Sequence, residues 1–306
     1  PEYGSLREEY TFGEAISTPS GATEISLQPF DGVGVDAVVI YSDILVALEP
    51  LGLSYHLESG VGPVVEDPIE GPEDIPREAA PVEDALDYVG GVVDGVDAAV
   101  GEQAATLGFA GGPFTLASYA VAGQPSKAHV PVRGFRAAHP AAFEDLLGTF
   151  TDVVIDLLQY QVEQGADAVQ LFDTYASLLG PADYREYVLP HHREILNAVD
   201  VPTILFVRNM GGRLETMAES GADVVSLDWT VDMADARSQL GERPVQGNLD
   251  PTDLLGDPET VRRRTEQVIE AAGPSGHILN LGHGVDKRTP VESVETFVET
   301  AQSCSW

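Results

Sequence analysis

Short runs of apolar and β-branched residues recur along this 306-residue chain, and their rhythm constrains the fold more than any other feature. Most of these runs are apolar throughout, which is typical of parallel strands that are buried on both faces. Helical stretches such as 141–164 and 214–220 lie between most of the runs. We expect strands at seven places along the chain: 36–41, 107–111, 167–172, 201–207, 223–227, 244–248 and 277–281.

The alternation of strand and helix predicts an α/β fold made of repeated βα units. Gly-Ala-Asp follows a helix and precedes a strand twice, at 165–167 and 221–223, and Gly165, Gly221 and Gly241 stand where helix C-caps are expected. This rhythm is typical of a (β/α)8 barrel of the TIM type, which has eight strands. One strand therefore either escapes recognition or lies outside the chain. We predict a single domain over residues 1–306, with an exposed excursion at 66–87.

The amino-acid composition limits the cellular environments and the binding partners that we expect for this chain. The net charge is −34, and a surface this acidic repels nucleic acid and anionic membranes, so neither is an expected partner. Lysine occurs only at Lys127 and Lys287, which favours adaptation to high salt over general solubility. No apolar run approaches the roughly 18 to 20 residues of a membrane span. Because Cys304 is the only cysteine, we expect no intrachain disulfide, no multi-cysteine metal site and a cytoplasmic location.

Polar residues follow the predicted strands one after another. Asp43 comes after the first strand, Tyr119 stands a short way beyond the second, and Thr174, Arg208 and His283 follow later ones. In α/β barrels the C-terminal strand ends form one rim, where active sites are built, so we expect a single shared pocket. Taken singly, Asp43 is equally typical of a helix N-cap, and His283 of a partner to a neighbouring strand end. Tyr119 and Thr174 are individually more typical of packing.

Three other motifs favour structural interpretations. Gly-Gly-Pro at 111–113 lacks both the Gly-Lys-Ser/Thr ending of a phosphate loop and dinucleotide-binding spacing, so we expect a tight turn there. Arg-Arg-Arg at 262–264 stands among acidic neighbours, which is typical of a solvated helix face. His191 and His192 have no further His, Cys or carboxylate partners at ligand spacing, so we expect no metal site there.

Two strand-end segments have distinctive sequences, Tyr-Ser-Asp-Ile-Leu at 41–45 and Asn-Leu-Gly-His-Gly at 280–284. Together with other strand-end segments they resemble the uroporphyrinogen decarboxylase family, which has Phe-Ser-Asp-Ile-Leu in place of the first. Gly-Phe-Ala-Gly-Gly-Pro-Phe-Thr-Leu-Ala-Ser-Tyr (108–119) is similar to its Gly-Phe-Ala/Ser-Gly-X-Pro-Trp-Thr-Leu-X-Thr-Tyr. Further matches follow in order at 1–3, 27–29, 172–174, 227–230, 246–251 and 280–284. One such motif can arise by chance, whereas this many, in order and over nearly the whole chain, form a specific signal.

The resemblance implies an enzyme without cofactor or metal that converts the four acetate arms of uroporphyrinogen III to methyls. The product is coproporphyrinogen III, on the route to haem. It implies that Asp43 is the catalytic carboxylate, which accepts hydrogen bonds from the pyrrole N–H groups. It also implies a homodimer with facing active-site clefts. The substrate-binding residues carried over from the family are Tyr119, Thr174, His283, Arg7 and Arg208.

The chain departs from the family pattern in several places. Relatives have Arg-Gln-Ala-Gly-Arg-Tyr-Leu directly before Pro-Glu-Tyr, and this chain starts at Pro1. By family analogy we expect two substrate-binding arginines and the first barrel strand to be missing. Arg208 stands where relatives often have lysine, which keeps the charge, and Phe114 replaces the usual tryptophan.

Two rival functions remain open. Methyltransferases that share this barrel bind zinc through His and Cys to activate a thiolate, and the single tail cysteine weighs against that function. A non-catalytic tetrapyrrole-binding homologue is the second rival, against which the presence of Asp43 and His283 weighs.

Overall fold

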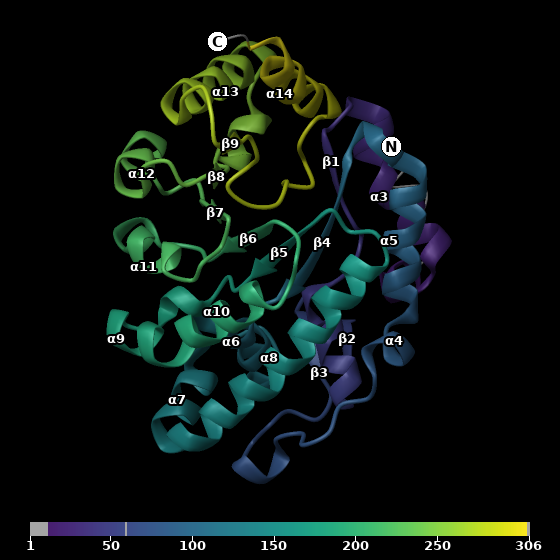
Figure 1. Ribbon diagram of the computed structural model, residues 1–306, viewed down its shortest axis with the longest axis vertical. Helices are drawn as coiled ribbons and strands as arrows, with labels where there is room; N and C mark the ends of the chain where they lie inside the picture. Colours follow the sequence, from purple (N-terminus) through teal and green to yellow (C-terminus); the bar gives the residue numbers. More distant parts are fainter. Residues whose placement is uncertain (1–11, 59, 305–306) are drawn as a thin grey trace.

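The computed structural model describes residues 12–58 and 60–304. Within them, seven parallel strands form one sheet in the order β1-β4-β5-β6-β7-β8-β9 (Figure 1). All seven predicted strands are confirmed, with slightly different bounds. They are β1 (Ala37–Val39), β4 (Ala105–Gly111), β5 (Ala168–Phe172), β6 (Thr203–Phe206), β7 (Val224–Ser226), β8 (Val245–Gln246) and β9 (His277–Ile278).

The sheet curves into the wall of a barrel. β1 and β9 are its two edges, yet residues of β1 and residues shortly after β9 line the same cavity, which requires the sheet to bend round. In the described residues this wall has seven strands, one fewer than a closed TIM-type barrel. The predicted fold class, an α/β barrel of the TIM type, is confirmed, and the described residues form a seven-stranded part of it. That the first strand is missing from this chain stays a prediction. That residues 1–306 form one domain stays a prediction.

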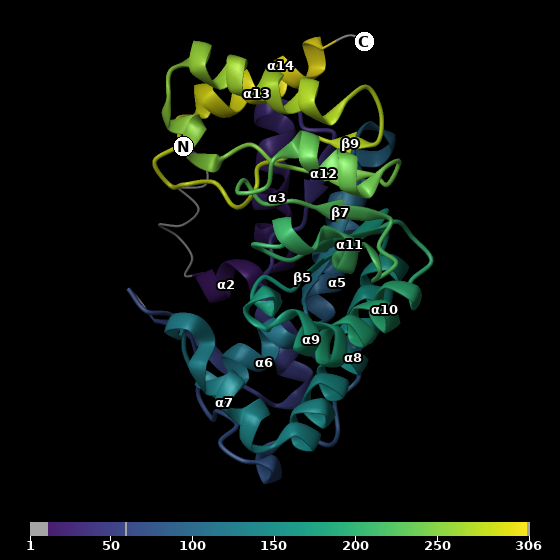
Figure 2. The ribbon, with the colours of Figure 1, turned by 90° about the vertical axis from the view of Figure 1, so that its left-hand side faces the viewer.

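Helices cover the outer face of the sheet, as Figures 1 and 2 show from two sides. Most of them connect one strand to the next, as α8 does between β4 and β5. The helices are α2 (Phe12–Ser17), α3 (Pro19–Val33), α4 (Val82–Ala85), α5 (Asp87–Val100), α6 (Pro113–Ala122), α7 (Val130–Ala138), α8 (Pro140–Glu163), α9 (Pro181–Asp183), α10 (Leu189–Asn197), α11 (Leu214–Ala218), α12 (Met233–Leu240), α13 (Pro258–Ala272) and α14 (Val291–Ser303). None of these described helices is both long enough and apolar enough to cross a membrane.

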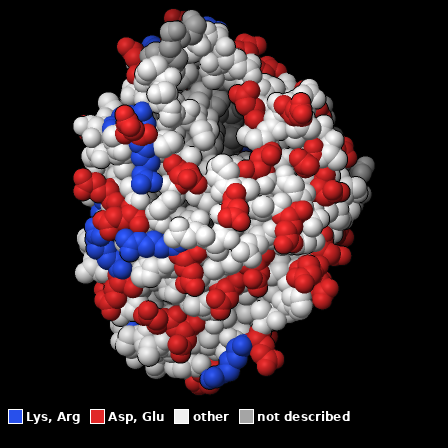
Figure 3. All heavy atoms as spheres, in the orientation of Figure 1, with Lys and Arg blue, Asp and Glu red and all other residues white. Residues whose placement is uncertain are grey.

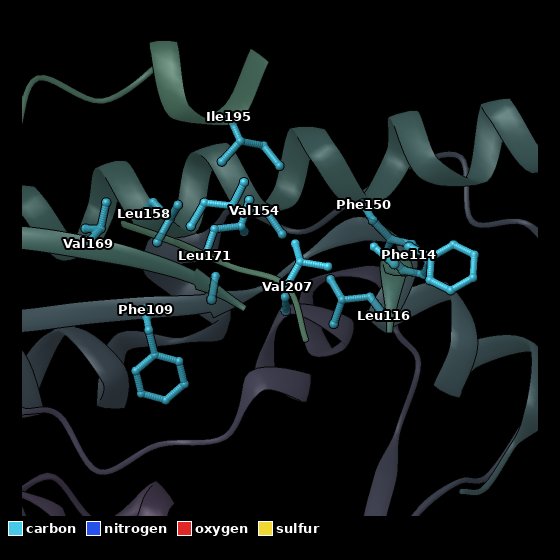
Figure 4. Close-up of a cluster of buried hydrophobic side chains, with 14 of the residues drawn as sticks. Phe109, Phe114, Leu116, Phe150, Val154, Leu158, Val169, Leu171, Ile195 and Val207 are labelled. Atoms are coloured by element: carbon cyan, nitrogen blue, oxygen red, sulfur yellow. The ribbon is translucent and has the colours of Figure 1, made fainter. Parts of the chain in front are cut away.

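Helix α8 illustrates how the outer layer is held. Its buried apolar residues recur three and four positions apart, which places them on one face of the helix. Val154 and Leu158 point toward Leu171 of β5, whereas Phe109 of β4 points to the opposite side of the sheet (Figure 4). Burying each such aliphatic side chain contributes about 1.5 to 3 kcal/mol. One face of the sheet therefore packs against helices, and the other faces the barrel interior.

Side chains fill the barrel interior in two layers. Residues two positions apart in a strand point to the same face, so each strand contributes to both layers. The lower layer is an apolar cluster of Leu107, Ile204 and Val224, with Ala168 packed against it. The upper layer, two residues further along the same strands, lines a cavity and comprises Phe109, Gln170, Phe206 and Ser226. The apolar layer thus lies beneath the cavity.

The structure adds an element that the sequence analysis missed. β2 (Tyr55–Glu58) and β3 (Gly62–Val65) form an antiparallel hairpin apart from the main sheet. The segment 66–87 that follows is mostly exposed, as predicted, and Ile69 anchors it. Ile69 is buried, and its backbone N–H donates to the carbonyl of Ala120 over 2.9 Å.

The predicted glycine positions serve different purposes. Gly241 is the C-cap of α12, as predicted. Gly165 and Gly221 lie one and two residues beyond the C-caps of their helices, in the positive-φ region that glycine enters freely. Gly112 has φ −77°, so its role is close packing, because a Cβ there would lie 2.3 Å from the Cβ of Asp173.

Candidate active site

A cavity of about 520 Å³ opens where the strands end at their carboxyl termini. Its lining comes from β1, β4, β5, β6, β7 and β8 and from the loops after β1, β5 and β9. Figure 3 shows that the face seen in Figure 1 is hollowed and that acidic side chains are spread around the hollow. Asp43, Thr174 and His283 all line the cavity. The cavity thus brings together three of the predicted site residues, whereas Tyr119 and Arg208 are not part of its lining. The roles of all five residues stay predictions.

Aromatic rings form one wall of this cavity. Phe109 and Phe172 meet edge to face with ring centroids 5.7 Å apart, and Phe172 meets Phe206 at 5.9 Å. All three line the cavity and come from the neighbouring strands β4, β5 and β6. Such a wall offers apolar contact area to a flat ring system of comparable extent.

Asp43 stands after β1 at the N-cap of the short helix η1 (Ile44–Leu51). One carboxylate oxygen accepts a hydrogen bond from the Leu45 N–H over 2.8 Å, and no other hydrogen bond to this carboxylate occurs among the described residues. Burial raises the pKa of Asp43, and the Leu45 hydrogen bond only partly offsets this. Asp43 is thus both an N-cap and a cavity residue, with acceptor capacity left for a ligand.

Tyr119 lies on α6 and is not part of the cavity lining. Its hydroxyl is 3.2 Å from the hydroxyl of Tyr175, and its side chain is 8% exposed. Burial is the main cause of its raised pKa, followed by the Tyr175 hydrogen bond, and the negative charge of Asp43 adds to the shift. Tyr119 therefore lies near Asp43, while Thr174 lines the cavity directly.

His283 lines the cavity, and Arg208 lies close to it without being part of the lining. The His283 ring lies edge-on to Phe206 (5.8 Å) and to Trp229 (6.1 Å), and no hydrogen bond to it occurs in the described part of the chain. Burial lowers the pKa of His283, as does the nearby Arg208, whereas Asp228 raises it. The Arg208 guanidinium stacks 4.8 Å from the centre of the Trp229 ring. Its Nε is buried without a hydrogen-bond partner among the residues described.

The two glycines beside His283 differ in their surroundings. A Cβ at Gly282 would lie 2.3 Å from the backbone nitrogen of Trp229, so this glycine lets two strand ends pack together. Gly284 faces open space. Arg7, the other predicted cation, falls outside the described residues.

Two buried carboxylates escaped the sequence analysis as individual residues. Asp173 has no exposed surface and accepts hydrogen bonds from the Thr115 N–H and hydroxyl, each 2.8 Å long, and from His192 Nε2 over 2.8 Å. Asp228 is 1% exposed and accepts from the backbone N–H groups of Asn209 and Thr230. Both lie in motifs that resemble the family, and both bind the polypeptide itself.

Three polar side chains inside strands were also missed. Gln170, Ser226 and Gln246 line the bottom of the cavity from β5, β7 and β8. The available signal was a glutamine in the otherwise apolar run Ala-Val-Gln-Leu-Phe. Polarity inside a buried strand indicates a ligand-facing position when no structural partner is evident.

Metal ligation finds no support in the described residues, where no three His, Cys, Asp or Glu side chains gather in a possible metal site. His192 pairs with Asp173, and His191 Nδ1 lies 3.0 Å from the Thr151 hydroxyl. Cys304 is exposed after the end of α14 and is not part of the cavity lining.

Fold and site define a TIM-type α/β-barrel enzyme, with a cavity that combines an aromatic wall, a partly buried carboxylate and an adjacent arginine. The chain belongs to the uroporphyrinogen decarboxylase family, whose model, described as "Uroporphyrinogen decarboxylase (URO-D)", matches residues 1–304. The uroporphyrinogen decarboxylase of Gloeobacter violaceus is 43% identical, over 99% of this chain and 89% of that protein. That of Chloroflexus aggregans is 42% identical, over 99% of this chain and 88% of its own length.

Two solved structures resemble the fold at low sequence identity. A methyltransferase from Methanosarcina mazei has a TM-score of 0.82 at 21% identity, covering 94% of this chain and 86% of that one. A B12-independent methionine synthase from Shewanella has a TM-score of 0.62 at 12% identity, covering 92% and 88%. At such identities the likeness concerns the fold alone.

Proposed function

We propose that this chain decarboxylates the four acetate arms of uroporphyrinogen III, giving coproporphyrinogen III, and that the 520 Å³ cavity is where this occurs. The observation that carries the proposal is Asp43, a partly buried carboxylate with unfilled acceptor capacity beside an aromatic wall. Family membership and the full-length matches to uroporphyrinogen decarboxylases support the same activity.

The chemical problem is the electron pair left on carbon when CO2 departs. Protonation of the pyrrole at a ring carbon makes a cationic ring, which accepts that pair as the carbon–carbon bond breaks. A second proton then completes the methyl group, and the first proton leaves the ring. The route we propose uses no cofactor, because the substrate is its own electron sink.

Asp43 stabilises the cationic ring in this proposal. A carboxylate only accepts hydrogen bonds, and the pyrrole N–H groups are donors that converge on the macrocycle centre. A fixed negative charge in a site shielded from water stabilises developing positive charge far more than it does in bulk water. The raised pKa of Asp43 supports this, because it reflects the burial that makes the charge effective.

The anionic arms need positive or hydrogen-donating partners in a chain of net charge −34. The Arg208 guanidinium is held against the Trp229 ring and lies near His283 of the cavity lining. This position supports carboxylate binding, because a guanidinium pairs with a carboxylate through charge-assisted hydrogen bonds. We assign His283 and Thr174 to arms at the cavity surface. We assign Tyr119 to the same task together with Tyr175, and Arg7 on family resemblance alone.

An anaerobic assay with uroporphyrinogen III tests the activity. We expect release of four CO2 per substrate and accumulation of coproporphyrinogen III, separated from partly decarboxylated intermediates by chromatography. Binding without CO2 release would identify a non-catalytic tetrapyrrole-binding homologue instead. Stoichiometric zinc in the purified protein together with alkylation of a thiol would identify a methyltransferase.

We further propose a cytoplasmic homodimer adapted to high salt. The acidic surface seen in Figure 3 and the presence of only two lysines support the salt adaptation, because salt screens repulsion between like charges. Thermal melts with and without molar KCl test it, and equal stability in both would refute it. Light scattering tests the dimer, for which the family resemblance is the support.

A further inference from the structure

The floor of the cavity is polar, although the barrel beneath it is apolar. Gln170, Ser226 and Gln246 are each at most 4% exposed and all line the cavity. Below them lies the apolar cluster that contains Leu107 and Ile204. The three polar side chains therefore stand between an apolar layer and the cavity.

The floor residues satisfy each other only in part. The Gln246 amide nitrogen donates to Gln170 Oε1 over 3.2 Å and to the Ser226 hydroxyl oxygen over 3.0 Å, which uses both of its hydrogens. The Gln170 amide nitrogen and the Ser226 hydroxyl hydrogen remain, and no hydrogen bond in residues 12–58 and 60–304 uses either donor. Gln246 thus holds the other two side chains in place and leaves two donors of the floor without a partner among the described residues. Gln246 Oε1 likewise accepts no hydrogen bond there, so the floor offers two donor groups and one acceptor to the cavity.

The two donors face the cavity, where water can bond them, so they do not carry the cost of an enclosed polar atom without a partner. Polar side chains are still unusual at this place, because apolar side chains fill most barrel interiors. Sequences that break a packing rule in this way do so mainly at functional sites. Donors with no acceptor point to a ligand that accepts hydrogen bonds, as a carboxylate does.

We propose that Gln170 and Ser226 hold the carboxylate of the acetate arm that is about to lose CO2, an inference that rests on the proposed function. Neutral donors stabilise a carboxylate less than a guanidinium does. Arms that keep their negative charge bind more strongly to a guanidinium, which Arg208 supplies at the other side of the site. The reacting arm loses its charge when its carbon–carbon bond breaks, CO2 leaves and the electron pair enters the protonated ring. A weakly stabilising floor beside the Phe109 wall suits that arm.

The proposal makes the floor selective for substrate over product. Coproporphyrinogen III has four propionates and four methyls and no acetate to place on the floor. Replacing Gln170 by Met keeps the length of the side chain and removes both donors. We expect kcat/KM for uroporphyrinogen III to fall by about tenfold or more, while Ki for coproporphyrinogen III changes by less than about twofold. Ser226→Ala should also lower kcat/KM for uroporphyrinogen III relative to Ki for coproporphyrinogen III, by a smaller factor.

Gln161→Met provides a matched control. Gln161 is equally buried but lies on α8, where its amide bonds both the N–H and the carbonyl of Phe109 from the helix side of the sheet. We expect a lower melting temperature for this variant and an unchanged ratio of kcat/KM to Ki. A purely structural role for the floor would make Gln170→Met behave in the same way, and that result would overturn the proposal.

Two further outcomes are informative. If Gln170→Met does not fold, Gln170→Glu keeps the shape and adds a charge, and it should lower kcat/KM more strongly with Ki unchanged. Weaker catalysis and weaker product binding by equal factors would refute the floor assignment.

If the wild-type protein releases no CO2, the proposed function is refuted independently of the floor. The floor is then tested by anaerobic calorimetry, which measures the affinity of wild type and of Gln170→Met for both porphyrinogens. Equal affinity ratios in the two proteins would overturn the floor proposal there too.

Discussion

Asp43 and Asp173 both follow buried strands in segments that resemble the same family, yet their surroundings are opposite. Asp173 is fully buried and its oxygens are occupied by Thr115 and His192. Asp43 accepts one backbone hydrogen bond and otherwise faces a cavity. Asp228 resembles Asp173, with its oxygens bound to the backbone of the next loops. A strand-end aspartate is therefore a structural clamp or a candidate for chemistry according to how many of its acceptor sites the chain already fills.

The contacts of Asp173 also give this carboxylate a positioning role. The Asp173 carboxylate binds the first turn of α6 at Thr115, and the Thr115 hydroxyl accepts from the backbone N–H of Tyr175 over 3.2 Å. Tyr175 in turn bonds Tyr119 on the same helix. Through this chain of contacts, a carboxylate outside the cavity positions a tyrosine close to Asp43.

The largest expected free-energy change follows from removing the Asp173 carboxylate. Asp173→Ala leaves the Thr115 donors and His192 buried without their acceptor, so we expect the free energy of unfolding to fall by about 3 to 5 kcal/mol. Urea unfolding followed by circular dichroism measures this. A fall of less than about 1 kcal/mol in the free energy of unfolding would contradict the structural role that distinguishes Asp173 from Asp43.

Arg208→Met tests the positive charge that complements Asp43. Without the guanidinium, a carboxylate arm loses a charge-assisted hydrogen bond, and we expect kcat/KM to fall by about tenfold to a hundredfold. Most of the change should appear in KM, and Arg208→Lys should recover part of it. Steady-state kinetics with uroporphyrinogen III decide this, and an unchanged KM would remove Arg208 from substrate binding.

The pH dependence of kcat/KM sharpens the contrast for Asp43. Its pKa in the ligand-free protein is raised above the ordinary value of 3.8 by burial, and the charged form is the active one in our proposal. Because kcat/KM reports ionisations of the free enzyme, it should decline as the pH falls through this raised pKa, at higher pH than an ordinary aspartate would give. A pH–rate profile without this acid limb would separate Asp43 from the rate-determining chemistry.

The smallest effect should come from Tyr175→Phe. The substitution removes the hydroxyl that pairs with Tyr119 and keeps the ring, so we expect a change of about 0.5 to 1.5 kcal/mol in the activation free energy. Comparison of kcat/KM for this variant and the wild type measures it. A loss as large as that of Arg208→Met would show that the tyrosine pair, and not the cation, dominates recognition.

Strand positions and the rim were predictable because a buried parallel strand needs a continuous apolar run, and the residues after it are free to be polar. Asp43, Thr174 and His283 were found in this way. The clamp role of Asp173 was not, because its partners Thr115 and His192 are distant in sequence and only the folded chain brings them together. The floor was missed because a glutamine within a strand does not reveal whether it faces a helix, as Gln161 on its helix faces β4, or a cavity.

The most direct test of the account is Asp43→Asn, assayed for both turnover and melting. We predict that kcat falls by about 10² or more, a loss of about 2.7 kcal/mol or more in transition-state stabilisation. A raised native pKa means that the charged carboxylate destabilises the fold at pH values above that pKa, so the melting temperature at neutral pH should stay equal or rise. Turnover near the wild-type rate in a folded Asp43→Asn variant would contradict the account.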